Sequence, residues 1–469
     1  MYTYVYMTRH PFGEFAKMAS ANPFGEERLA LERRIGKAPT NAARDEVFER
    51  CLTSVSSALG KGLYGRATQG ERDAIERAIA FVVIHRFSRE IDKHIEAQLE
   101  SARPIRPSFA KSVLSALDAY GIKGLRALEH IPLLFQLRRA YVFIDRSVTG
   151  ESRPIQGLRE ALWNNIFTHD LKRYAETLTR RMEDFSTILL GETGTGKGAA
   201  AAAIGMSGYI PWNEHSGMFR ETFAATFVPL NLSEYAESLI ESELFGHEKG
   251  AFTGALQPRK GAFERCSEFG SVFLDEIGDL DPAIQVKLLR VLEARQFTPV
   301  GGTEARRFAG RTIAATHRSL EELRESGRMR SDFYYRLCSD VIRMPSLRER
   351  IDAHPGELRI LLDRIVTRVL GESSPSVAEQ TERVIARSLP ENYAWPGNIR
   401  ELQQCVRRVL LTSTYEGDPL VKGVRGTAQS RSQAALRDRA RALYLSTGNY
   451  GAVARAMGID RRTAKKYAH

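Results

Sequence analysis

A glycine-rich loop that follows a short apolar segment limits the possible folds of this chain more than any other feature. Residues 186–190 are strand-like, and residues 191–197 then read GETGTGK, which fits the pattern G-x-x-x-x-G-K. Glycines allow backbone amides to turn toward phosphate oxygens, and the positive end of the following helix faces the same anion. We therefore predict a nucleotide site whose contacting residues are Gly191, Glu192, Thr193, Gly194, Thr195, Gly196, Lys197 and Gly198.

The second half of such a site is an apolar strand that ends in acidic residues, and residues 271–276, SVFLDE, have this pattern. Asp275 is a candidate ligand for Mg²⁺, and Glu276 is a candidate to polarise the attacking water. Acidic residues at strand ends are common, so this pair alone would indicate a structural role. Together with the phosphate loop, the pair favours hydrolysis of ATP with Mg²⁺ as cofactor.

Hydrophobic periodicity divides the chain. Residues 71–100 carry apolar side chains at three- and four-residue spacings, which predicts a long amphipathic helix within a mostly helical region up to about residue 160. From about residue 186, short apolar segments alternate with helical ones, a pattern typical of an α/β domain with a parallel sheet. Another helical stretch follows at residues 352–412, before a polar linker.

Composition excludes several classes of protein. The chain of 469 residues is 43% hydrophobic and 27% charged, as in soluble globular proteins. Its longest apolar stretch, residues 78–84, is far shorter than the ~20 residues of a membrane span. No secretory signal is visible, and we expect a cytoplasmic protein without a membrane segment. The cysteines show neither a CxxC pair nor disulfide-like spacing, and they are Cys51, Cys266, Cys338 and Cys405.

The net charge of +11 is concentrated near the end of the chain. Residues 421–469 hold eleven lysines and arginines against two aspartates, so they carry nine of the eleven net positive charges. A basic terminal segment indicates nucleic acid or an acidic surface as partner. A solvated basic helix is the alternative on charge alone.

Residues 241–255, ESELFGHEKGAFTGA, resemble the signature of the bacterial enhancer-binding activators of sigma-54 RNA polymerase, which are AAA+ ATPases with the hallmark hexapeptide GAFTGA. The resemblance continues through FLDEIGDL, KLLRVLEARQFTPVGG, SDFYYRL and WPGNIREL, and covers roughly residues 186–412. It implies an AAA+ P-loop domain with a helical lid. It also implies that the hexapeptide contacts sigma-54 through Gly250, Ala251, Phe252, Thr253, Gly254 and Ala255.

The hexapeptide is also consistent with this role on physical grounds. Gly250 and Gly254 give the backbone freedom on either side of Phe252 and Thr253. A mobile tip with an aromatic ring and a hydroxyl can grip a partner in one nucleotide state and withdraw in another. An ordinary surface turn would explain the glycines but not the Phe-Thr tip.

Further roles follow from the resemblance alone. Asn231 matches the asparagine that couples Glu276 to the nucleotide state, and Arg400 matches the lid arginine that contacts nucleotide. Arg330 and Arg336 match arginine fingers, which stabilise phosphoryl charge in a neighbouring subunit. The family therefore implies a ring of subunits, expected to be a hexamer, with a heptamer left open.

Three departures from the family pattern bear on activity. Gly198 stands where the general motif has serine or threonine and this family usually has glutamate. His317 replaces the usual asparagine of the first sensor, and the segment after Arg350, IDAHPGEL, is unlike the common form. ATPase activity is expected because Lys197 and both acidic residues of the site are present.

The tail resembles the helix-turn-helix domain that ends these activators. Residues 449–456 would form the first helix, 457–459 the turn and 460–468 the recognition helix. Asp460 is a candidate cap of the second helix. A helical tail without DNA contacts is the alternative. The expected DNA-contacting residues are Arg461, Arg462, Thr463, Lys465 and Lys466.

The N-terminal region resembles no familiar sensor. No aspartate precedes Asp45, so the acidic pocket of a phosphorylatable receiver is missing. A helical regulatory module and a packing or oligomerisation module are equally compatible with the sequence. The expected domains are a helical region at 1–160, a nucleotide-binding α/β subdomain at 161–350, a helical lid at 351–415, a linker at 416–433 and a helix-turn-helix at 434–469.

The combined hypothesis is a DNA-bound activator that hydrolyses ATP to remodel the closed complex of sigma-54 RNA polymerase holoenzyme, bound to double-stranded DNA upstream of the promoter. One alternative is a DNA-binding regulator whose ATPase is impaired by Gly198 and His317. The other is an AAA+ ATPase that remodels a different protein.

Overall fold

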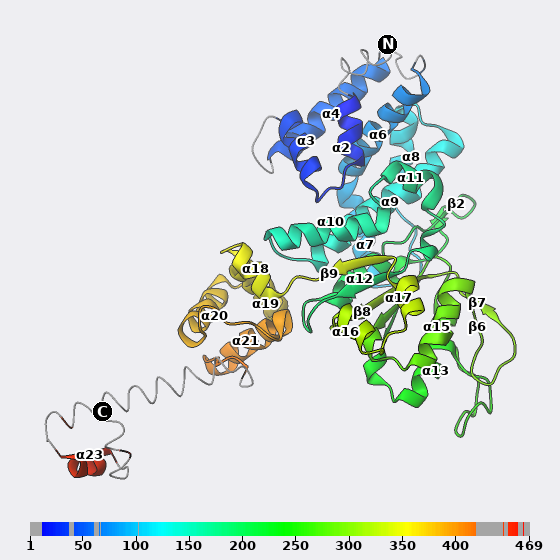
Figure 1. Ribbon diagram of the computed structural model, residues 1–469. Coiled ribbons are helices and arrows are strands. Elements are labelled where there is room, and N and C mark those ends of the chain that lie inside the picture. Colours follow the sequence, from blue (N-terminus) through cyan, green and yellow to red (C-terminus); the bar gives the residue numbers. More distant parts are fainter. Residues whose placement is uncertain are drawn as a thin grey trace. The chain divides into compact units, whose positions relative to one another are not determined.

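The computed structural model describes residues 12–36, 42–60, 65, 67–101, 103–418, 444, 449–457 and 463. The chain divides into two compact units, Met1–His354 and Pro355–His469, and each is described by itself. Figure 1 shows the helices and strands along the chain.

A five-stranded parallel sheet forms the centre of the first unit (Figure 1). Its strand order is β4-β5-β8-β1-β9, so strands distant in sequence are neighbours, as in α/β folds with crossover helices. This confirms the predicted parallel sheet. The strands are β1 (Thr187–Leu190), β4 (Phe227–Asn231), β5 (Ser271–Asp275), β8 (Arg311–Thr316) and β9 (Asp340–Arg343).

Helices cover both faces of the sheet, because successive strand residues point to opposite sides. In β1, Leu189 packs with the cluster that contains α12 (Lys197–Gly205), whereas Ile188 packs with the opposite cluster. The second cluster is built from α13 (Glu237–Phe245), α15 (Pro282–Ala294), α16 (Leu320–Glu325) and α17 (Ser331–Leu337). Smaller elements are β2 (Trp212–Asn213), β3 (Met218–Phe219), α14 (Ala262–Arg265), β6 (Gln296–Phe297), β7 (Arg306–Arg307) and α18 (Leu347–Ala353).

The region before the sheet is helical, as predicted, within the residues described. Its hydrophobic core is continuous with the α12 face of the sheet. The helices are α2 (Phe12–Ser20), α3 (Glu26–Gly36), α4 (Ala42–Gly60), α6 (Gln69–Arg86), α7 (Ser88–Leu99), α8 (Phe109–Ala119), α9 (Gly124–Ser147), α10 (Arg153–Phe167) and α11 (Leu171–Arg173), followed by the π-helical turn η1 (Tyr174–Leu178).

The prediction of one continuous helix over residues 71–100 is wrong. The structure has two helices there, α6 and α7, which are separated at Phe87 (φ −104°, ψ 14°). Ser88 donates its hydroxyl to the carbonyl of His85 at 2.9 Å, which satisfies an acceptor near the end of α6. The break lets α7 turn and pack along α9.

A buried arginine joins the helical region to the sheet. Arg311 on β8 donates to the backbone carbonyl of Asn165 at 3.2 Å, to its Oδ1 at 2.9 Å and to Thr187 Oγ1 at 2.9 Å. Burial lowers the pKa of Arg311 to about 10. Because Asn165 lies on α10, this network fixes the end of the helical region against β1 and β8.

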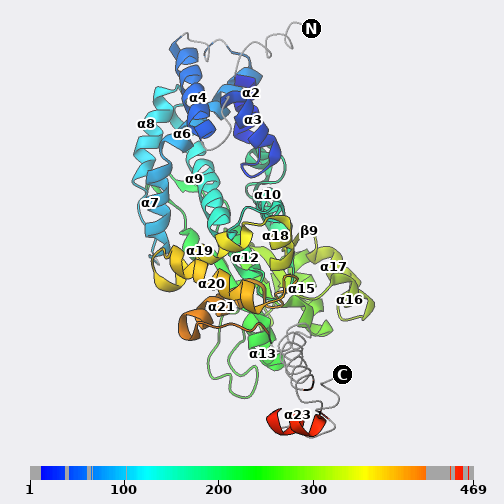
Figure 2. The same cartoon turned by 90° about the vertical axis from the view of Figure 1, so that its left-hand side faces the viewer.

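The second unit contains a helical bundle. Tyr393 and Tyr415 both donate their hydroxyls to Glu401 Oε1, at 2.5 and 2.8 Å, and Gly397 N donates to its Oε2 at 2.9 Å. Figure 2 shows these helices in a second orientation. They are α19 (Glu357–Leu370), α20 (Pro375–Ser388) and α21 (Asn398–Thr412), and the tail contributes α23 (Tyr450–Met457).

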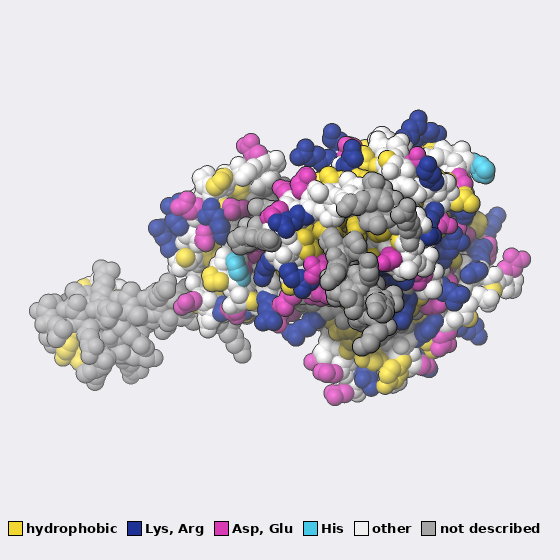
Figure 3. Space-filling view, turned by 90° about the horizontal axis from the view of Figure 1, so that it is seen from above, with side chains coloured by type: hydrophobic (Ala, Val, Ile, Leu, Met, Phe, Trp, Pro, Cys, Tyr) yellow, Lys and Arg dark blue, Asp and Glu magenta, His cyan; other side chains and the backbone are white. Residues whose placement is uncertain are grey.

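Lysine and arginine side chains are interspersed with acidic ones on the face of the helical region in Figure 3. On this face the basic side chains do not form a patch of a single sign. The four cysteines are free. No helix among the described residues is long and apolar enough to cross a membrane. The expected domain boundaries stay predictions.

The burial of His94 predicts a pH-dependent stability. The His94 ring packs against the rings of Phe109 and Phe135, with centroid distances of 5.4 and 5.6 Å, and burial lowers the pKa of His94 to about 4. The folded state therefore excludes the proton that the unfolded chain binds below pH ~6.5. The contribution of neutral His94 to the free energy of unfolding is therefore fully present above pH ~6.5 and is lost as the pH falls toward 4. Between pH 7 and 5, about 2 kcal/mol of unfolding free energy should disappear.

Urea unfolding at both pH values measures this effect. His94→Leu should show a smaller loss between pH 7 and 5 than the wild type, whereas the exposed-site control His169→Leu should behave as the wild type does. An equal loss in His94→Leu and wild type would contradict the assignment.

Candidate functional site

The carboxyl ends of three neighbouring strands bring the predicted nucleotide residues to one edge of the sheet. The phosphate loop follows β1, Asp275 ends β5, and His317 follows β8. The parallel register pairs Leu274 with Ala314 and Asn231 with Asp275, which places these strand ends side by side. Ligands of open α/β sheets bind at this edge.

The phosphate loop has the backbone conformation that its glycines permit. Gly194 and Gly196 have φ angles of 81° and 99°, which few other residues adopt. Gly191 approaches Met344 so closely that a Cβ would lie 2.8 Å from the Met344 Cβ. The loop then leads directly into α12, whose amino-terminal N–H groups face the position of a bound anion.

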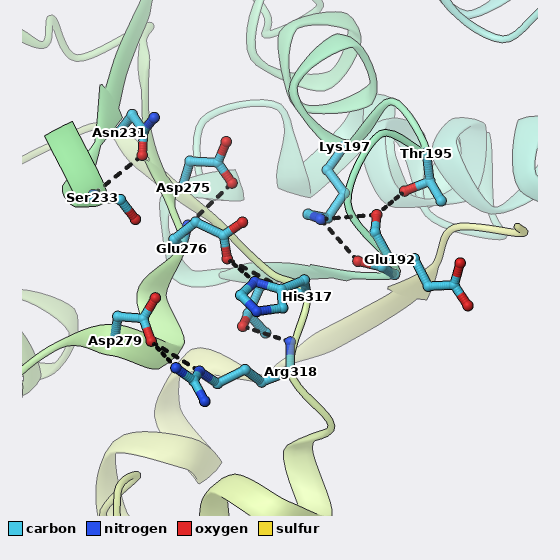
Figure 4. Close-up of polar contacts among 12 residues, drawn as sticks. Glu192, Thr195, Lys197, Asn231, Ser233, Asp275, Glu276, Asp279, His317 and Arg318 are labelled. Carbon is cyan, nitrogen blue, oxygen red and sulfur yellow. Dashed lines mark hydrogen bonds and ion pairs between the residues drawn. The ribbon is translucent and has the colours of Figure 1, made fainter. Parts of the chain in front are cut away.

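Lys197 is buried and donates its ammonium to the carbonyls of Gly191 and Glu192, at 2.8 and 3.2 Å (Figure 4). Thr195 donates its hydroxyl to the same Glu192 carbonyl at 2.8 Å. The ammonium group of Lys197 is therefore bound by carbonyls of the same phosphate loop. A Cβ at Gly198 would contact Phe273 at 3.9 Å, an ordinary van der Waals distance. The space at this position would therefore allow a side chain, and crowding does not explain why glycine replaces the usual residue here.

Glu276 and His317 form a direct contact (Figure 4). Glu276 has a left-handed backbone (φ 57°, ψ 45°), which is uncommon for a residue with a side chain. Its Oε2 lies 2.7 Å from His317 Nδ1 and accepts the His317 backbone N–H at 3.4 Å. Asp275 Oδ1 accepts the Glu276 N–H at 3.1 Å. The candidate catalytic glutamate is thus held by the residue that departs from the family pattern.

Asn231 has different partners in this structure. Its Oδ1 accepts the N–H of Ser233 at 3.2 Å, and its Nδ2 donates to Glu234 Oε1 at 2.9 Å. Asn231 thereby caps the short turn after β4, beside Asp275 in the register. No hydrogen bond between Asn231 and Glu276 is present among the described residues, and the expected coupling between them stays a prediction.

The two candidate arginine fingers lie in different environments. Arg330 is exposed before α17 and pairs with Asp332 at 2.8 Å, which raises the pKa of Arg330 and lowers the pKa of Asp332. Arg336 donates through Nε and Nη2 to the carbonyl of Leu292, at 2.9 and 2.7 Å. Arg336 therefore ties α17 to the end of α15, whereas the side chain of Arg330 is exposed to solvent.

The GAFTGA segment forms an exposed loop with a closed base. Gly250 N donates to the Ala255 carbonyl at 2.8 Å, and both loop glycines have positive φ angles, 83° for Gly250 and 103° for Gly254. Phe252 is 39% exposed and packs edge-on against His247, with ring centroids 5.0 Å apart. Phe252 and Thr253 are thus exposed to solvent on a loop whose base is closed by a backbone hydrogen bond.

Two other sets of predicted residues belong to the second unit. Arg400 is exposed near the start of α21 in the second unit, beside the strained Asn398 (φ 51°). In the tail, α23 agrees with the first predicted helix, and Thr463 is helical. The other predicted DNA contacts lie outside the described residues, and they are Arg461, Arg462, Lys465 and Lys466.

Comparisons with known proteins agree with these observations. Residues 166–343 match the family model described as Sigma-54 interaction domain, and residues 353–430 match AAA+ ATPase lid domain. The described α/β domain and helical lid of an AAA+ protein are thus confirmed.

Curated relatives match over different lengths. The Nif-specific regulatory protein of Azotobacter vinelandii is 42% identical over 308 residues (61% of this chain, 55% of that protein). The DNA-binding transcriptional regulator NtrC of Klebsiella pneumoniae is 34% identical over 320 residues (66% and 64%). The transcriptional regulatory protein ZraR of Escherichia coli K12 is 31% identical over 442 residues (91% and 90%). The chain therefore spans less than two thirds of the first two relatives but nearly all of the third.

The contact between His317 and Glu276 predicts a selective effect on turnover. His317→Ala removes the group that orients the glutamate, so kcat for ATP should fall roughly tenfold while KM changes less than about twofold. His317→Asn, which keeps a donor, should retain more of the rate. A steady-state ATPase assay with the exposed-site control His215→Ala measures both constants. A wild-type or higher kcat in His317→Ala would contradict the positioning role.

Proposed function

The chain belongs to the family of sigma-54-dependent transcriptional regulators, and from this premise we propose that it hydrolyses ATP to remodel the sigma-54 RNA polymerase closed complex. The observation that carries this proposal is the joint presence of the nucleotide edge and the exposed GAFTGA loop in one compact unit. One site supplies the energy of hydrolysis, and the other presents a surface to the partner.

The nucleotide edge contains the groups that ATP hydrolysis needs. The amino terminus of α12 and Lys197 would bind the phosphates, Lys197 exchanging its two carbonyl acceptors for phosphate oxygens. Asp275 offers the carboxylate oxygens that suit Mg²⁺, an ion that would neutralise phosphate charge. Glu276, held at one oxygen by His317, keeps its other oxygen available to orient and polarise the attacking water.

A ring of subunits would complete this site. Arg330 is exposed, and within the described part of the chain its side chain binds only the exposed Asp332, so it could exchange this partner for phosphate oxygens of a neighbouring subunit. Arg336 is committed to Leu292 within its own subunit. We therefore assign the arginine finger that acts on the neighbouring subunit to Arg330, and we assign to Arg336 the positioning of α17. We expect the ring to be a hexamer and the protein to be cytoplasmic.

The loop would transmit hydrolysis to the polymerase. His247 at its base contacts Ser242 Oγ on α13 at 2.7 Å, and Glu248 N donates to the Val300 carbonyl. These contacts connect the loop to elements of the same α/β domain that holds the nucleotide. Phe252 and Thr253 would contact sigma-54, Arg400 would sense nucleotide from the lid, and the basic tail would bind DNA upstream of the promoter.

Open-complex formation at a sigma-54 promoter tests the function. With purified protein, polymerase and ATP, the wild type should open the promoter. Thr253→Ala should lose at least about tenfold of this activity while hydrolysing ATP normally, since the side chain is exposed and distant in sequence from the phosphate loop. Thr303→Ala, another exposed threonine, is the control. Equal opening by Thr253→Ala and wild type would favour remodelling of a different protein.

A second experiment tests the hydrolytic role of Glu276. Glu276→Gln removes the charge but keeps the size of the side chain, so turnover should fall at least about 100-fold while ATP binding is retained. Parallel measurements of phosphate release and nucleotide affinity separate the two effects. Absence of turnover in the wild type would instead support the regulator with an impaired ATPase.

A further inference from the structure

The helices before the sheet line an open cavity of about 1040 Å³. Helices α6 and α9 contribute most of its wall. The rest comes from α2, the turn after it, α3, α4, α7, α10 and the segment around α11 and η1. Its volume is at the upper end of the range for small-molecule sites, roughly 300–1,000 Å³. Every lining residue precedes the phosphate loop in the chain, so this cavity is separate from the nucleotide edge.

The wall combines apolar rings with paired charges. Phe81 and Trp163 are each 6% exposed, and Tyr141 of α9 also lines the cavity. Such aromatic surface suits a ligand with an apolar body. Four acidic side chains of the wall already pair with cations: Glu32 with Arg28, Glu76 with Arg126, and both Asp73 and Glu176 with Lys172.

Arg77 differs from these paired groups. Its Nε is buried and has no hydrogen-bond partner, and no ion pair to Arg77 exists among the described residues. Asp45 and Glu129, the wall acids that likewise lack an ion pair in the described part of the chain, are exposed. The uncompensated charge inside the cavity is therefore positive. Because Arg77 lines the cavity, an anionic ligand there would meet a guanidinium that no acidic side chain of the described residues neutralises.

Helix α9 connects the cavity to the nucleotide edge. Leu134, Leu137 and Tyr141 line the cavity, whereas Gln136 lies on another side of the same helix. Gln136 donates to the Ser207 carbonyl at 2.9 Å and to the Tyr174 hydroxyl at 2.6 Å. Ser207 follows α12, the helix that begins with Lys197.

A second arginine strengthens this connection. Arg139 of α9 is fully buried, donates to the carbonyl of Gly208, and lies over the rings of Phe135 and Phe223, at 4.9 and 5.2 Å from their centroids. Together with Gln136, it couples α9 to the segment after α12. A small movement of α9 would consequently reach the helix that holds the phosphate loop.

We propose that the cavity binds a small organic anion with an apolar, ring-containing body, and that its occupancy alters ATP turnover through α9 and α12. Arg77 binds the anionic group, and the ring side chains of the wall contact the body. The proposed binding of the anion depends on the cavity and not on the proposed function. The proposed effect on ATP turnover rests on the proposed ATP hydrolysis.

Fluorescence titration of the full chain, without nucleotide, tests binding. The probe is 8-anilinonaphthalene-1-sulfonate, and N-phenyl-1-naphthylamine is the uncharged comparison. The wild type should bind the sulfonate saturably at one site, and at least tenfold more tightly than the neutral probe. Arg77→Gln should weaken sulfonate binding roughly tenfold, and Arg77→Lys should restore most of it.

Arg33→Gln, an exposed arginine outside the cavity, is the matched control and should bind as the wild type does. Circular dichroism verifies that each variant is folded. Equal affinity for the two probes, or unchanged binding by a folded Arg77→Gln, would overturn the proposed site. Because no nucleotide is present, this result is independent of ATPase activity.

The coupling is measured as ATP turnover with and without saturating sulfonate probe. The wild-type rate should change at least twofold, and the rate of Arg77→Gln should not respond at the same probe concentration. Gln136→Met should bind the probe with wild-type affinity but lose the response. A wild-type rate that does not respond, or an equal response in Gln136→Met, would overturn the coupling. A wild type without turnover would contradict the proposed function and the coupling, while the binding result would stand.

Discussion

The parallel pairing of β1, β8 and β5 is the constraint on which the rest of the structure depends. Since the three strands run in the same direction, their carboxyl ends meet at one edge. That edge collects Lys197, Asp275, Glu276 and His317 from segments that lie far apart in the sequence. A different strand order would keep every motif intact and separate the groups that must act together. The parallel strand register thus brings the residues of three local motifs together at one candidate nucleotide site.

The helical region is joined to this sheet by buried polar groups as well as apolar packing. Arg311 links β8 to α10, and Arg139 and Gln136 link α9 to the segment after α12. Burying polar and charged groups is costly, and the hydrogen bonds that Arg311, Arg139 and Gln136 make across these segments offset part of that cost. These bonds therefore favour one particular arrangement of the packed elements. This explains why residues before and after the phosphate loop form a single compact unit, and why a change among the helices can influence nucleotide chemistry.

Local chemistry explains what the sequence could predict. The glycine loop, the strand that ends in Asp275 and the GAFTGA segment are read from short patterns, because backbone conformation and side-chain charge act over a few residues. Helical periodicity likewise predicted the N-terminal helices. It did not predict the break at Phe87, which depends on the packing of α7 along α9.

Contacts between distant segments explain what was missed. The pattern identified His317 as unusual but did not identify Glu276 as its partner, since that contact requires the pairing of β5 with β8. The family resemblance treated Arg330 and Arg336 alike, whereas only the packing of α15 against α17 shows that Arg336 holds the Leu292 carbonyl. The cavity beside α9 was beyond sequence reasoning for the same reason, because it arises from several helices at once.

The central claim is that the nucleotide edge controls the partner surface, and site-specific crosslinking tests this claim most directly. Leu256, which is 80% exposed beside the loop, can be replaced by a photoreactive phenylalanine derivative. Irradiation with purified sigma-54 would then be compared between ADP and ADP with aluminium fluoride, an analogue of the hydrolytic transition state. The account predicts a crosslink to sigma-54 that depends on the transition-state analogue. An equal yield with ADP alone, or no crosslink in either state, would contradict it.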